Sequence, residues 1–142
     1  MNLRKLSFQR LTYVGIRDID DFEAQTINEN NIRVLDVPNV IDYIRDLQGP
    51  IHISFDVDAL DPELVDSTGT RVPEGLEPEE VREIIKTALE VDKLVSLDVV
   101  EFNKDLGDPQ NSLMAVKRVF EPESFTESDS DGPRAHAAQS RL

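Results

Sequence analysis

The sequence contains no cysteine and only two histidines among its 142 residues. The absence of cysteine excludes a disulfide framework, a zinc site built from thiolates and a cysteine nucleophile. No apolar run reaches the ~18 residues that a membrane-spanning helix requires, and residues 1–10 are too polar to form the core of a signal peptide. We therefore expect a soluble, cytoplasmic protein that has no membrane partner.

Basic residues are also scarce. Lys and Arg number 15 against 29 Asp and Glu, which gives a net charge of −14. A surface this negative repels phosphate backbones, so we expect no nucleic-acid partner. The 39% of hydrophobic residues is enough to form a core, and the length is typical of a single domain.

Apolar runs alternate along the chain with segments of helical periodicity. The runs predict strands at residues 11–16, 32–37, 51–57 and 94–100. The helical spacing of apolar side chains predicts helices at residues 18–29, 38–47, 77–90 and 109–120. Because strands that look apolar on both faces alternate with helices, we predict an α/β fold, with a mainly parallel sheet in a three-layer α/β/α arrangement. Residues 121–142 are rich in Ser, Asp, Glu, Pro and Ala, which predicts a disordered acidic tail.

Acidic residues follow two of the predicted strands. Asp56 and Asp58 end one of them, and Glu101 follows another. Ligands of parallel α/β sheets bind at the carboxyl ends of the strands, and residues i and i+2 of a strand share a face. Two neighbouring carboxylates are costly to bury unless a cation or a proton compensates them, and such oxygen ligands suit magnesium, calcium or manganese. The alternative is that these acids cap helices or form ion pairs.

Three segments together resemble the ureohydrolase family, which comprises arginase, agmatinase and formiminoglutamase. The longest is SFDVDALDPELVDSTGTRVPEG at residues 54–75, and the others are YVGIRDID at 13–20 and LDVVEFN at 97–103. The resemblance extends from about residue 11 to residue 120 and is strongest to the arginase branch. It implies that residues 1–120 are the C-terminal half of an arginase-like domain.

The resemblance also implies a manganese-dependent reaction. In the family pattern, Asp56 matches the carboxylate that bridges two manganese ions, and Asp58 matches a ligand of one of them. Two divalent ions lower the pKa of a bridging water enough to produce hydroxide near neutral pH. The implied reaction of the intact enzyme is hydrolysis of L-arginine to L-ornithine and urea.

The implied substrate contacts lie in three parts of the chain. Glu101 matches the catalytic acid that holds the guanidinium group, which a carboxylate can bind through a bidentate pair. Asp20 and Glu23 match positions that contact the α-amino end of the substrate, and Thr70 lies in the loop that lines the pocket. The resemblance further implies a homo-oligomer that takes a small guanidino substrate.

The sequence departs from the family pattern in its metal ligands. The Gly-Gly-Asp-His and Asp-Ala-His-x-Asp segments that complete the manganese site are missing. His52 lies in a predicted strand, where we expect a structural role, and His136 lies in the predicted tail, where we expect none. Two aspartates cannot hold two metal ions. We therefore expect this chain alone to have little or no activity.

Smaller departures affect the loops of the predicted pocket. Asp66, Arg71 and Lys104 stand where the pattern has proline, and Glu74 replaces the first of two glycines. Glycine at that position serves close approach of the backbone, so Glu74 puts the pocket loop in doubt.

Three functions therefore stay open: an arginase, an agmatinase or another ureohydrolase, and a degenerate fragment or interaction module without catalytic activity. Asp20 and Glu23 favour arginase. The final Ser140-Arg141-Leu142 resembles the Ser-Lys-Leu peroxisomal signal, so a peroxisome-like organelle is an alternative location.

Overall fold

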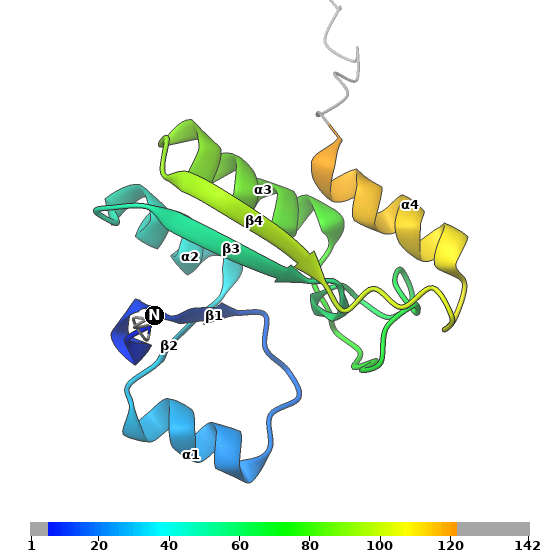
Figure 1. The fold of residues 1–142 in the computed structure, drawn as a ribbon, viewed down its shortest axis with the longest axis horizontal. Helices are drawn as coiled ribbons and strands as arrows, with labels where there is room; N and C mark the ends of the chain where they lie inside the picture. Colours follow the sequence, from blue (N-terminus) through cyan, green and yellow to red (C-terminus); the bar gives the residue numbers. More distant parts are fainter. Residues whose placement is uncertain (1–5, 122–142) are drawn as a thin grey trace, which may run out of the picture.

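The computed structural model describes residues 6–121, in which strands and helices alternate along the chain (Figure 1). The elements, in chain order, are β1 (Thr12–Val14), α1 (Asp21–Glu29), β2 (Arg33–Leu35), α2 (Val37–Asp46), β3 (Ile51–Asp56), α3 (Pro78–Glu90), β4 (Leu94–Val100) and α4 (Pro109–Phe120). Short 3-10 turns cover Phe8–Arg10 and Val57–Ala59. The order confirms the predicted α/β fold, although β1 and β2 are shorter than the predicted strands. The predicted tail, with His136 and the Ser140-Arg141-Leu142 terminus, lies outside the described residues.

The helices begin where local capping groups satisfy their free backbone amides. Asp36 caps α2 by accepting a hydrogen bond from the amide of Asn39 at 3.0 Å, and Asp108 caps α4 in the same way. Each of α2, α3 and α4 also has a proline in its first turn, where the missing N–H costs nothing. These caps explain why the sequence pattern located these helices well.

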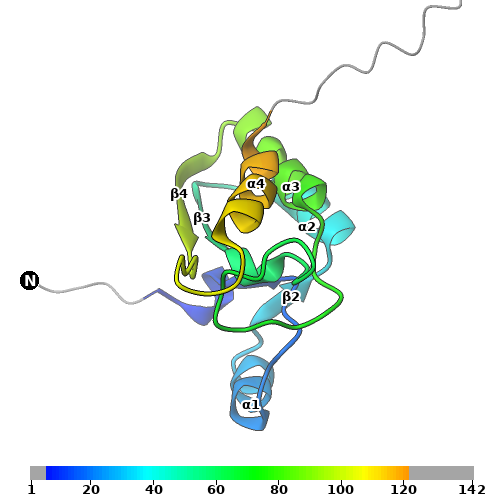
Figure 2. The same ribbon diagram turned by 90° about the vertical axis from the view of Figure 1, so that its right-hand side faces the viewer.

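The strands form two parallel pairs. β1 pairs with β2, and β3 pairs with β4 in a register that places Asp56 beside Val100. Helices α2, α3 and α4 lie on one side of the β3–β4 pair (Figure 2). Phe55 of β3 is buried on that side together with Val81 and Ile85 of α3 and Val116 of α4.

Strand β4 is less buried than its apolar sequence indicates. We predicted a fully buried strand, but the side chain of Val95 is 69% exposed and that of Val99 is 45% exposed. The reason is that β4 pairs on one edge only, and the helices of residues 6–121 pack against one face of the pair. No helix in the described part of the chain is long and apolar enough to cross a membrane.

Candidate functional site at the ends of β3 and β4

Asp56 and Asp58 lie on one turn at the carboxyl end of β3. Between them, Val57 is completely buried in the core, so the two aspartates turn away from the core while the valine anchors the turn. The Asp56 side chain caps the turn, and its Oδ1 accepts a hydrogen bond from the Asp58 amide at 3.1 Å. The structure therefore places the two carboxylates at the strand end predicted from the sequence.

Burial and neighbouring negative charge raise the pKa of Asp58 above its ordinary value. Desolvation is the largest cause, followed by the negative charge of Asp56, and Glu101 adds a smaller effect in the same direction. The positive charge of Arg17 acts in the opposite direction. Carboxylates that repel one another in this way favour a shared cation or proton.

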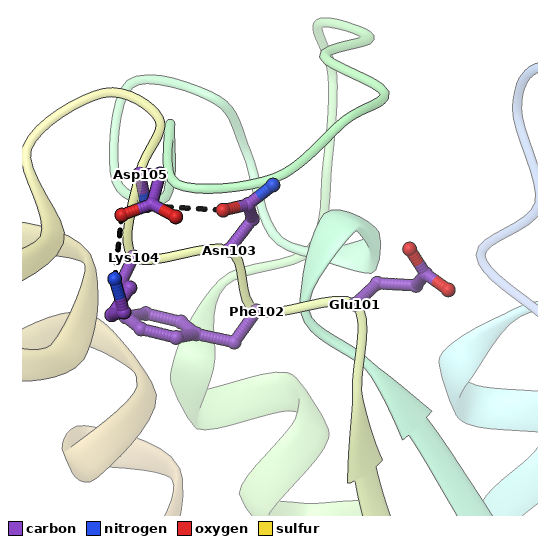
Figure 3. Close-up of a pocket in the computed structure, with 5 residues that line it drawn as sticks. All are labelled: Glu101, Phe102, Asn103, Lys104 and Asp105. Atoms are coloured by element: carbon purple, nitrogen blue, oxygen red, sulfur yellow. Dashed lines mark hydrogen bonds and ion pairs between the residues drawn. The ribbon is translucent and has the colours of Figure 1, made fainter.

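Glu101 reaches the same site from the neighbouring strand. It follows β4 directly, and the pairing of Asp56 with Val100 brings the two strand ends together. Its backbone has a φ of 62°, in the left-handed region that non-glycine residues rarely adopt. Figure 3 shows the Glu101 side chain pointing away from Asn103, Lys104 and Asp105. It is exposed and free to meet a ligand at this edge.

The rest of the β4–α4 loop is held by its own contacts. Residues 101–105 line an open surface pocket, in which Lys104 pairs with Asp105 at 2.6 Å (Figure 3). The Asn103 amide donates to the carbonyl of Ser67 at 2.8 Å and so joins this loop to the long loop that follows β3. Lys104, which replaces a proline of the family pattern, thus has a local ionic partner.

The loop from residue 57 to residue 76 folds back on itself. Oδ2 of Asp61 accepts a hydrogen bond from the Gly75 amide at 3.0 Å, and Leu60 forms a parallel bridge with Leu76. These backbone hydrogen bonds lower the pKa of Asp61, the amide of Glu63 having the largest effect. Thr70 is exposed near the tip of this loop, as a pocket-lining residue would be.

Two departures from the family pattern have visible consequences in this loop. Glu74 has a φ of 64°, a conformation that suits glycine, so the substitution strains the backbone. Asp66 has gained partners instead. Its Oδ1 accepts hydrogen bonds from the Asp108 amide at 2.8 Å and from the Ser112 hydroxyl at 3.1 Å, and the Asp108 hydrogen bond is the main reason that its pKa is lowered.

Asp20 and Glu23 lie elsewhere, at the start of α1. They form a reciprocal capping box, in which Asp20 Oδ1 accepts from the Glu23 amide at 2.7 Å and Glu23 Oε2 accepts from the Asp20 amide at 3.0 Å. Within residues 6–121, neither forms a hydrogen bond or ion pair with Asp56, Asp58 or Glu101. Both views show α1 apart from the ends of β3 and β4 (Figures 1 and 2).

Arg17 is a site residue whose role could not be predicted from the sequence. Its guanidinium donates hydrogen bonds to the carbonyl of Asp58 at 2.7 Å and to that of Ala59 at 3.0 Å, so it lies directly behind the turn that carries the aspartates. A single arginine directly after an apolar strand, in a chain this acidic, was the only available signal.

The chemistry of the site suits a hard divalent cation, but the ligand set is too small. Asp56 and Asp58 offer carboxylate oxygens, which manganese and magnesium prefer. No group of three or more His, Cys, Asp or Glu side chains in the described residues is arranged to hold a metal ion. His52 lies on β3, where its Nδ1 is 2.7 Å from the Ser96 hydroxyl and its Nε2 is 3.5 Å from Asp98, so its contacts tie β3 to β4. The described residues do not make a two-metal site.

The chain is similar to known proteins over 70% to 81% of its length. It is 40% identical over 112 residues to an arginase from Glaciozyma antarctica, an alignment that covers 70% of this chain and 32% of the relative. Among solved structures, the arginase of Entamoeba histolytica in complex with L-ornithine matches with a TM-score of 0.69 and 30% identity, over 81% of this chain and 44% of that protein. A hypothetical agmatinase from Burkholderia thailandensis matches with a TM-score of 0.62 and 26% identity, over 78% of this chain and 36% of that protein.

Each of these matches covers only part of the related protein. The chain spans about a third of the length of the Glaciozyma arginase and less than half of each solved structure. A sequence model described as the arginase family also matches residues 2–122. This chain belongs to the arginase family.

Proposed function

We propose that residues 1–120 form the C-terminal half of an arginase-like domain and contribute to hydrolysis of the guanidino C–N bond of L-arginine, which yields L-ornithine and urea. The observation that carries the proposal is the placement of Asp56, Asp58 and Glu101 at the carboxyl ends of two paired parallel strands. The match to 44% of the Entamoeba histolytica arginase supports the assignment of this chain to part of a larger domain.

In this proposal, Asp56 and Asp58 supply part of a manganese site. The raised pKa of Asp58 supports it, because crowded carboxylates gain most from a bound cation. When bound, manganese ions supply the acidity that converts water to hydroxide near neutral pH. The further ligands that two ions require come from outside the described residues, since no complete cluster is found within them.

The proposed substrate contacts follow from charge. Glu101 is exposed beside the two aspartates and can hold a guanidinium group through a bidentate, charge-assisted pair. Thr70 is exposed on the loop that follows the aspartates, and in this proposal it contacts the substrate from that loop. Asp20 and Glu23 accept the α-amino end of the substrate, directly or through water, and this contact favours arginine over agmatine. Each of these two carboxylates has a second oxygen that the capping box leaves available.

The proposal also covers the assembly and the isolated chain. A homo-oligomer is proposed from the family resemblance. The chain alone is expected to be inactive because its described residues lack a complete metal cluster.

A chimeric enzyme tests the proposed function. The segment of the Glaciozyma antarctica arginase that matches this chain is replaced by residues 1–120 of this chain, and urea release is measured with manganese. We expect arginine hydrolysis that is lost on Asp58→Asn, and little hydrolysis of agmatine. A folded chimera that releases no urea overturns the proposal, and equal rates with agmatine overturn the choice of substrate.

A second candidate is a non-catalytic fragment that keeps the fold and has lost the reaction. Two observations favour it: the absence of a three-ligand cluster in residues 6–121, and the strained Glu74 in the pocket loop. The same chimera separates the candidates, because a degenerate segment folds on the scaffold without restoring urea release.

A further inference from the structure

Arg17 uses its whole guanidinium group on backbone carbonyls. Nη1 donates to the carbonyls of Gly15 at 3.1 Å and Ala59 at 3.0 Å, and Nη2 donates to those of Asp58 at 2.7 Å and Val72 at 3.1 Å. Nε adds a second hydrogen bond to the Val72 carbonyl at 3.3 Å. Guanidinium has five N–H donors in a fixed planar fork, so each donor is used.

The four carbonyls belong to three separate segments of the chain. Gly15 directly follows β1, Asp58 and Ala59 belong to the turn with the aspartates, and Val72 lies in the loop that carries Thr70. In the described part of the chain, the β1–β2 pair and the β3–β4 pair share no strand ladder. Arg17 therefore links one strand pair to the turn and the loop that follow the other.

The neighbourhood of Gly15 shows that this junction is closely packed. Gly15 has a φ of 70°, and a Cβ atom placed on it would lie 3.0 Å from Cδ1 of Leu76. Leu76 in turn donates its amide to the Ala59 carbonyl at 2.8 Å. The end of β1, the aspartate turn and the end of the long loop thus meet at Arg17.

We propose that Arg17 is a positioning residue that holds the backbone of the Asp56–Asp58 turn and of the Thr70 loop in the geometry needed to bind a divalent cation and substrate. The proposal rests on the proposed function, because it gives that site its fixed shape. Lysine cannot replace arginine here, because an ammonium group has three donors at one point and cannot reach four carbonyls in three segments.

The test compares Arg17→Lys and Arg17→Met with Arg33→Met in the 142-residue chain. Arg33 is a matched control: it is also half-buried, it lies on the neighbouring strand β2, and it donates to the Tyr43 hydroxyl at 2.8 Å, away from the aspartate turn. Two quantities are measured: hydrogen exchange of the Leu60, Asp61 and Leu76 amides, which are bonded within the loop, and affinity for Mn²⁺ alone by electron paramagnetic resonance.

We expect both Arg17 variants to speed exchange of these three amides by about tenfold or more while the amides of α3 keep their protection, because hydrogen bonds to a charged group are lost locally. We also expect the affinity for Mn²⁺ to fall by at least about threefold in both variants, whereas Arg33→Met lowers the unfolding temperature and leaves Mn²⁺ affinity unchanged.

Unchanged exchange at the three amides overturns the proposal. If the unmodified chain binds Mn²⁺, faster exchange with unchanged Mn²⁺ affinity also overturns it, because Arg17 would then be purely structural. If the unmodified chain binds no Mn²⁺, the metal part of the proposed function fails, while selective loosening of the three amides still supports the positioning role. If Arg17→Met does not fold, Arg17→Lys alone decides, since it retains the charge and most of the length.

Discussion

The Asp58 amide donates a hydrogen bond to Oδ1 of Asp56 at 3.1 Å, so one turn holds both carboxylates that the proposed metal site requires. With two protein ligands, binding of Mn²⁺ to the isolated chain should be weak. Asp56→Asn and Asp58→Asn should each weaken it further, by about tenfold or more, because each removes a negatively charged ligand. Titration followed by electron paramagnetic resonance measures the affinity, with Asp42→Asn on the exposed face of α2 as the control. Tight binding of two manganese ions per chain would contradict the incomplete ligand set.

The raised pKa of Asp58 predicts that removal of its charge stabilises the metal-free chain, although the same substitution weakens metal binding. Without metal, Asp58→Asn should stabilise the chain at pH 7, because the folded state no longer holds an ionised carboxylate that burial and Asp56 disfavour. The folded-state pKa lies above the ordinary value of 3.8, so the gain should be complete above the folded-state pKa and disappear as the pH falls from there to 3.8. Urea unfolding of both proteins between pH 3 and pH 8 measures it. A variant that is less stable than the unmodified chain at pH 7 would show that Asp58 is not under electrostatic strain.

Local sequence patterns located most of the fold. The predicted strand at 94–100 and the predicted helix at 109–120 coincide with β4 and α4, because apolar periodicity and the Asp108–Pro109 cap are both local signals. The burial of β4 was predicted wrongly, since exposure of Val95 depends on which elements cover the sheet and not on the strand itself.

The candidate site could be predicted only where its residues follow strands. Asp56, Asp58 and Glu101 were found because strand ends and a family motif mark them. Arg17 was not, because three of its four acceptors are backbone carbonyls 41 to 55 residues away in the sequence, and no side-chain pattern encodes a carbonyl.

The two glycines of the long loop should respond differently to alanine. A Cβ atom on Gly75 would lie 2.3 Å from the Asp61 amide nitrogen, so Gly75→Ala forces the loop away from Asp61. On Gly69, a Cβ atom meets no atom within 4 Å. We expect Gly75→Ala to cost about 1–3 kcal/mol of unfolding free energy and Gly69→Ala to change it by less than about 0.5 kcal/mol. Equal stabilities in chemical denaturation would show that the loop does not pack closely at Gly75.

Exposed apolar side chains predict association of the isolated chain. Val95 on the open edge of β4 is 69% exposed and Met114 on α4 is 65% exposed. Unpaired edges and apolar patches promote self-association, and lysine on an edge strand opposes it. We expect Val95→Lys combined with Met114→Lys to lower the sedimentation coefficient, whereas Asn39→Lys with Gln110→Lys, which adds the same charge at exposed polar positions, should not. If both double variants act alike, net charge and not the apolar surface controls association.

Restoring glycine at position 74 should stabilise the chain. Glu74 has a φ of 64°, and a left-handed backbone costs a non-glycine residue roughly 1–2 kcal/mol, of which the greater unfolded-state freedom of glycine cancels roughly 0.5–1 kcal/mol. Glu74→Gly should therefore raise the unfolding free energy by about 0.5–1 kcal/mol. Glu63→Gly is the matched control, because Glu63 is another exposed glutamate of the same loop without a positive φ, and there glycine should destabilise the chain. Thermal unfolding of the two variants measures both effects. If both substitutions destabilise the chain, the loop tolerates Glu74 without strain. The strained Glu74 would then no longer support the non-catalytic candidate.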